Sequence, residues 1–115
     1  MFRRRLIAVL SAVAILSTVV ASIEAAPLRM LRDQGWVVDD RYGKKHANPE
    51  SAQEILKAVD AGEKLVFWSE SEEAYYPIED QVIAKLWIGK RVEILGNVMP
   101  DGTLRVGNYR EAKEN

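Results

Sequence analysis

The chain ends in a strand, turn and strand pattern, and this feature most constrains what it can fold into. Apolar and polar residues alternate over residues 91–98, and the alternation resumes over residues 103–106. Residues 100–102, Pro-Asp-Gly, lie between the two runs and are typical of a tight turn in which Gly102 takes a positive φ. This period of two predicts a β-hairpin with one apolar side. The inward positions are Val92, Ile94, Gly96, Val98, Leu104 and Val106.

Three more strands are predicted upstream of this hairpin. They are expected at residues 35–40, 65–70 and 74–79, and the polar residues 71–73 make the last two a second hairpin. Five strands in so short a chain favour a mainly β, α+β domain with a small, strongly bent antiparallel sheet or an OB-like partial barrel. Gly96 supports the bend, because glycine inside a strand often marks a bulge. A flat sheet covered by a helix on one face is the alternative.

Two short helices are predicted between the strands. Asn48 and Pro49 supply an N-cap and a first helical position, and apolar residues then recur with helical spacing until Gly62 ends the helix. The polar, glycine-containing residues 41–48 before this helix read as a loop. The second helix is expected at residues 80–88.

The N-terminus has the pattern of a secretory signal peptide. Three arginines at residues 3–5 precede an apolar or small-residue run over residues 6–23, and a cut after Ala25 leaves Ala26 as the first mature residue. An uncleaved anchor is the alternative, because about 18 apolar residues can just span a bilayer. The expected organisation is a signal peptide at 1–25, a short linker at 26–34, one β domain at 35–112 and a polar tail at 113–115.

The charge and the cysteine content restrict the expected location of the protein and the classes of partner it can bind. Removing residues 1–25 takes away three arginines and one glutamate, which leaves 13 basic and 16 acidic side chains and a net charge of about −3. A nucleic-acid partner is not expected, because such binders carry a clustered basic face. We expect a periplasmic or secreted protein with no stable membrane insertion after cleavage. The chain has no cysteine, so its stability must come from its core rather than from disulfides.

Several short motifs resemble an uncharacterised family of small exported bacterial proteins, a domain of unknown function with an OB-like, β-rich fold. The motifs are G-W-V-V-D-D at 35–40, a loop ending in His46, A-G-E-K-L-V-F-W at 61–68, Y-x-I at 76–78, G-K-x-V-x-x-x-G at 89–96 and D-G-T-L-x-V at 101–106. The resemblance covers about residues 35–109. It implies a fold and an exported location, and it implies no activity.

Family members often carry three cysteines that this chain does not keep. One lies in the loop before the histidine and two lie on the helix, at positions that correspond here to Tyr42, Glu54 and Ala58. The resemblance therefore implies that any thiol, disulfide or metal role of those cysteines is absent from this chain.

His46 is the one histidine of the sequence and the first candidate for chemistry. Asp39 and Asp40 shortly precede it, so a metal held by two carboxylates and an imidazole is one interpretation. A solvated loop residue is the other interpretation, and it is the one we expect. The sequence then predicts no metal, no cofactor and no catalytic residue, and it predicts that His46→Ala changes stability by less than about 0.5 kcal/mol.

Three aromatic residues are the candidates for a ligand-binding surface. Trp68, Tyr75 and Tyr109 share the outward parity of their strands, and exposed aromatic side chains on an OB-like sheet commonly hold sugars or bases. The alternative places Trp68 in the core, under the helix that starts at Asn48, because a small domain must bury most of its large apolar side chains.

Two classes of function remain open. The first is a non-enzymatic binding module that engages a protein, a glycan or a small ligand through its sheet. The second is a small hydrolase or metal-dependent enzyme that uses the loop around His46. The expected function is the binding module.

Overall fold

The structure, a computed structural model, describes residues 26–113. The predicted signal peptide, residues 1–25, and the last two residues lie outside this part of the chain. The elements follow in the order β1 (Arg29–Asp39), the short 3-10 helices η1 (Gly43–His46) and η2 (Pro49–Ser51), α2 (Ala52–Asp60), β2 (Leu65–Ser69), β3 (Ala74–Pro77), α3 (Gln81–Lys85), β4 (Arg91–Val98) and β5 (Leu104–Glu111).

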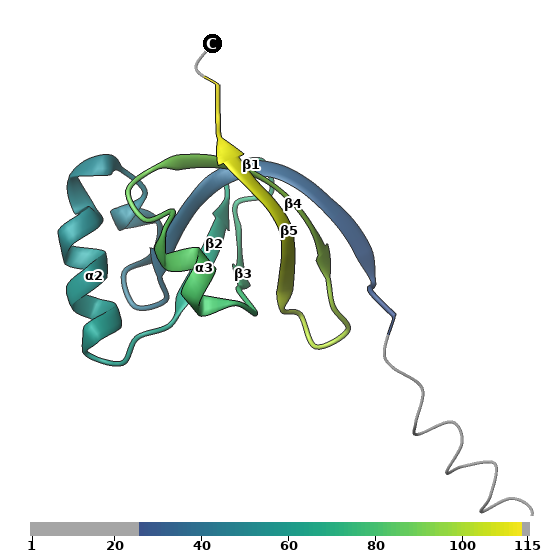
Figure 1. Cartoon of the computed structure of the whole chain (residues 1–115), viewed down its shortest axis with the longest axis horizontal. Helices are drawn as coiled ribbons and strands as arrows, with labels where there is room; N and C mark the ends of the chain where they lie inside the picture. The colour runs from purple at the N-terminus through teal and green to yellow at the C-terminus, as the bar shows by residue number, and fades with distance from the viewer. Residues whose placement is uncertain (1–25, 114–115) are drawn as a thin grey trace, which may run out of the picture.

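The strands form one antiparallel sheet in the order β3-β2-β1-β4-β5. Figure 1 shows β1 arching across the sheet, with α3 on the concave side. The predicted mainly β, α+β domain with a small, bent antiparallel sheet is therefore confirmed. The sheet is not a closed barrel. A short parallel bridge joins Ile78, just after β3, to Leu104 of β5, and it brings the two ends of the sheet together at one point.

A bulge in the terminal hairpin contributes to the bend. The register between β4 and β5 shifts between Leu95 and Gly96, because Leu95 faces Asn108 whereas Gly96 faces Val106. Gly107 is thus the extra residue, and a bulge of this kind increases the local twist of a strand pair. A Cβ at Gly96 would lie 2.6 Å from the Arg105 carbonyl oxygen, so only glycine permits the two strands to approach this closely.

Most of the core lies on the concave face of the sheet, while Val38 and Val66 are buried on the other face. Along β4, half-buried and buried residues alternate as the sequence predicts. Every second residue of β1 and β2 continues this face, and Ile55 of α2 is fully buried against it. The largest fully buried side chains are Phe67, Ile55, Leu65, Ile94 and Leu104. Burying a side chain of this size contributes about 1.5–3 kcal/mol.

Both predicted helices are present, and both are shorter than expected. The Asn48 side chain accepts a hydrogen bond from the Ser51 backbone N–H at 2.9 Å, as an N-cap should, but the first turn is the 3-10 helix η2 before α2 begins. The Asp80 side chain caps α3 by accepting from the N–H groups of Val82 and Ile83 at 3.1 Å each. The turn after β4 also agrees with the sequence, since Gly102 has φ +88°.

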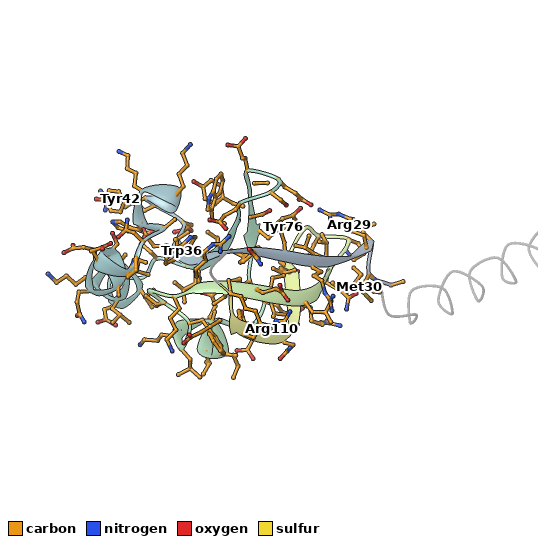
Figure 2. All side chains as sticks on the ribbon, turned by 90° about the horizontal axis from the view of Figure 1, so that it is seen from above. Arg29, Met30, Trp36, Tyr42, Tyr76 and Arg110 are labelled. Atoms are coloured by element: carbon orange, nitrogen blue, oxygen red, sulfur yellow. The ribbon has the colours of Figure 1, made fainter. Side chains whose placement is uncertain are left out.

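The predicted linker at residues 26–34 is wrong for most of its length. β1 begins at Arg29, and residues 29–36 pair with β4. The Arg29 guanidinium donates a hydrogen bond to Glu72 at 3.1 Å and lies over the Tyr76 ring, and Figure 2 shows Arg29 and Tyr76 at the same end of the domain. The polar residues of this segment do not have the apolar alternation of a strand. Its strand structure depends on pairing with β4, about 60 residues further along the chain.

Candidate binding groove and the Asp39–His46 pair

The three aromatic candidates do not form one surface. Trp68 pairs with Tyr75 across β2 and β3, and their ring centroids lie 4.7 Å apart. Side chains alternate between faces along a strand, so this pair lies on the opposite face from Phe67. Tyr109 faces Ile94, which shares the face of Phe67. The structure therefore brings Trp68 and Tyr75 together and separates them from Tyr109.

The Trp68–Tyr75 pair is packed against η1. The Tyr75 hydroxyl accepts a hydrogen bond from the Lys44 backbone N–H at 2.9 Å, and the Lys44 ammonium lies 5.8 Å from the centre of the Trp68 ring. Trp68 is half-buried against the core, and Tyr75 is 47% exposed. Trp68 is therefore neither openly exposed on the sheet nor fully buried under α2, the two alternatives that the sequence left open. The pair holds the loop after β1 against the sheet, and less of its surface is open to a ligand than predicted.

Tyr109 belongs to a groove between α3 and β5. Its ring stacks on Trp87, with centroids 5.4 Å apart and planes inclined by 13°. The groove has a volume of about 400 Å³, within the usual size range of ligand sites. Its walls are Asp80, Ile83, Trp87, Val106, Gly107, Asn108 and Tyr109.

The helix that forms one wall of this groove, α3, exposes several apolar side chains to solvent. Val82 is 78% exposed and Leu86, directly after α3, is 69% exposed. Ile83, which lines the groove, is 43% exposed. A short surface helix normally turns a polar side to water. Contiguous exposed apolar side chains on a small domain are typical of a binding surface.

Burial in this groove changes the acidity of Tyr109. Burial raises the pKa of Tyr109 to about 12, and the negative charge of Asp80 adds to the shift. The ordinary tyrosine pKa is 10.0. The folded state thus holds the phenol neutral at a pH at which the unfolded chain releases the proton.

A spectrophotometric titration measures the pKa of Tyr109 in the folded protein. The stability contribution of the neutral phenol is fully present below pH 10 and is lost as the pH rises toward 12. In the folded protein, Tyr109→Phe should remove the phenol that ionises near pH 12 from the phenolate absorbance curve, and it should flatten the loss of stability between these two pH values. A Tyr109 phenol that ionises near pH 10 would mean that the groove is open to water at this residue.

His46 is not the solvated loop residue that the sequence predicted. Its Nδ1 donates a hydrogen bond to the Asp39 carboxylate at 2.6 Å, and its side chain is only 15% exposed. Asp39 has no exposed surface, and its second oxygen accepts from the Tyr42 backbone N–H at 2.9 Å. The Tyr42 ring packs on the imidazole, with centroids 5.0 Å apart. The 3-10 helix η1 folds the chain back after β1 and makes this contact.

The two aspartates before His46 have separate partners. Asp40 does not join the Asp39–His46 pair; its hydrogen bond with Glu63 is the main cause that raises the pKa of Glu63. Among residues 26–113, no three His, Asp or Glu side chains are placed to hold a metal ion. The pair as described fixes the orientation of the imidazole and ties η1 to the end of β1.

Within residues 26–113, no helix is both long enough and apolar enough to cross a membrane.

Comparison with known proteins gives no match: no family model, no curated protein and no solved structure is significantly similar to this chain. The groove is therefore interpreted from its own geometry. Sequence reasoning identified Tyr109 as a candidate but did not assign Ile83 or Trp87 to a site. The signal for the groove was the run Val-Ile-Ala-Lys-Leu-Trp at residues 82–87, which holds more apolar residues than one helix face needs.

Proposed function

We propose that this protein is an exported, non-enzymatic binding module whose ligand occupies the groove between α3 and β5. The observation that carries the proposal is the exposed apolar surface of Val82, Ile83 and Leu86 beside the stacked rings of Trp87 and Tyr109. Exposing these side chains to water is unfavourable, and a ligand that fills the groove and extends over α3 would cover them. The basic and apolar pattern of residues 1–25 supports the export.

The loop around His46 gives less support to an enzyme. Hydrolytic catalysis needs a nucleophile that the imidazole can activate. The imidazole of His46 contacts the Asp39 carboxylate and the Tyr42 ring. Asp39 ends β1 and Tyr42 directly precedes η1, so both contacts stabilise the turn between these two elements. The groove is therefore the better candidate for the functional site.

Site-specific photocrosslinking in producing cells tests the binding function. A photoreactive amino acid replaces the exposed Leu86, the residue directly before the groove residue Trp87, or, as the control, Lys57 on the exposed side of α2. We expect a discrete adduct from position 86 and none from position 57, because a ligand in the groove lies against the first position alone. Intact-mass analysis of the adduct shows whether the ligand is a protein, a glycan or a small molecule.

A second variant ties the adduct to the groove itself. Gly107 lines the groove, and a Cβ there would meet only the Leu95 carbonyl oxygen, at 3.5 Å, which is an ordinary contact. Gly107→Leu therefore adds a side chain at the groove wall without a backbone clash at its Cβ, and it should remove the adduct from position 86. Equal adducts from both positions, or none from either, would show that the groove is not the binding site.

A further inference from the structure

The strand that forms one wall of the groove is also an edge of the sheet. β5 pairs with β4 on one side and has no strand partner on the other within the described residues, apart from the single bridge at Leu104. An edge strand presents backbone N–H and C=O groups that another strand can pair with. The ligand of the groove thus meets a row of backbone groups as well as apolar side chains.

The hydrogen bonds at the two ends of β5 fix which residues present those groups. The Thr103 carbonyl accepts from Met99 at 2.8 Å, and the Ala112 N–H donates to Arg91 at 2.9 Å, so both residues turn their backbone toward β4 or its continuation. In an antiparallel pair this direction alternates along the strand. With the extra residue Gly107 included, Val106 and Tyr109 turn their backbone away from β4. The Leu104 carbonyl agrees with this pattern, because it accepts from Glu79 rather than from β4.

The residues whose side chains line the groove are therefore also the residues whose backbone groups face the open edge. Val106 and Tyr109 both line the groove, and both direct their backbone groups to the open edge beside it. In an antiparallel strand pair, residues that exchange backbone hydrogen bonds also place their side chains on the same face. A strand added to this edge would direct every second side chain into the groove.

Two of the polar and aromatic groups of the groove, Trp87 and Asp80, already have partners. The Trp87 ring is stacked on Tyr109 and has the Lys90 ammonium 5.4 Å from its centre. The Asp80 carboxylate accepts the two N–H groups that cap α3. A sugar that stacks on a ring and bonds to a carboxylate would compete with these contacts. An extended peptide would use the unpaired edge and the apolar walls instead.

We infer that the ligand is an extended polypeptide segment of a partner protein, which adds to β5 as an antiparallel strand and places apolar side chains at alternate positions into the groove. This inference rests on the proposed function and names its ligand class. Antiparallel pairing fits because the rest of the sheet is antiparallel and such pairs are the more stable. Strand addition of this kind combines backbone pairing for affinity with pockets for alternate side chains.

The experiment selects ligands from a display library of random linear peptides on the exported protein, with counter-selection on Gly107→Leu. The selected peptide is then resynthesised with single N-methyl groups along its length. Methylation at alternate positions, those whose apolar side chains the groove needs, should weaken binding about tenfold or more, because each such methyl removes a hydrogen bond to β5. Methylation at the positions between them should change affinity less than about twofold, since those N–H groups face away from the edge.

Each other outcome overturns the inference. No enriched peptide, or an affinity loss without a period of two, excludes strand addition. A loss confined to the positions whose side chains face away from the groove overturns the antiparallel direction. A stable dimer in sedimentation that the peptide dissociates would assign the edge to a second copy of this chain. Binding of a linear N-acetylglucosamine hexamer, lost in Gly107→Leu, would assign the groove to a glycan.

Two controls separate this inference from the proposed function. Leu86→Lys, at an exposed position, is a second blocking variant in case Gly107→Leu fails to fold, and thermal unfolding checks both. A crosslink at position 86 without any strand-pairing peptide would keep the binding function and reject the peptide. If neither a crosslink at position 86 nor a strand-pairing peptide is found, the binding function and the peptide ligand are both rejected.

Discussion

Gly35→Ala is expected to lower the free energy of unfolding by about 3 kcal/mol. Gly35 lies in the middle of β1, between Ser69 of β2 and Val92 of β4. A Cβ at this position would overlap the Trp68 carbonyl oxygen and lie 2.9 Å from its carbonyl carbon. Both atoms belong to the backbone of a paired strand, so no side-chain rotation can relieve the overlap. One methyl group must therefore push β1 and β2 apart at the centre of the sheet.

The matched control is Gly107→Ala, which makes the same change in another strand. Its Cβ would make one ordinary contact, at 3.5 Å to the Leu95 carbonyl oxygen. We expect a change of less than about 0.5 kcal/mol for this control. Urea denaturation of both variants measures the difference. If the two substitutions cost the same, the close approach of β1 and β2 at Gly35 is not a constraint on the fold.

Local patterns predicted most of the strands and the presence of both helices. The alternation of β4 and β5, the N-cap Asn48 and the positive φ of Gly102 each depend on neighbours a few residues away. The start of β1 could not be predicted in this way. Asp33 points to the inner face, where it accepts hydrogen bonds from the Ser69 and Ser71 hydroxyls, so the expected apolar residue is absent from that position.

The candidate site was predicted in part, for a related reason. Alternation within a strand shows which residues share a face, but it does not show which faces of two strands coincide. Trp68 and Tyr109 have the same outward parity within their own strands, yet the strand order and the bulge at Gly107 place them on opposite faces. The contact between Trp87 and Tyr109 depends on where α3 packs, and no local pattern determines that.

Asp39→Ala is expected to destabilise the protein by about 3 kcal/mol, because two donors lose a shared, fully buried acceptor. The Asp39 carboxylate accepts from the Tyr42 N–H at 2.9 Å and from His46 Nδ1 at 2.6 Å. Each buried donor that is left unpaired costs about 1–3 kcal/mol. Asp40→Ala is the control, because it removes the neighbouring carboxylate, which is exposed. It should change stability by less than about 0.5 kcal/mol.

His46→Ala should cost about 2 kcal/mol, more than the small effect that the sequence predicted. It leaves the Asp39 carboxylate buried, with the hydrogen bond from the Tyr42 N–H still in place. The double variant should lose less than the sum of the two single losses, because either substitution alone already breaks the hydrogen bond; a coupling of about 1–2 kcal/mol is expected. Chemical denaturation of the four proteins gives this value directly. Additive losses would mean that Asp39 and His46 stabilise the turn independently, and the contact between them would then be a consequence of the fold rather than a reason for it.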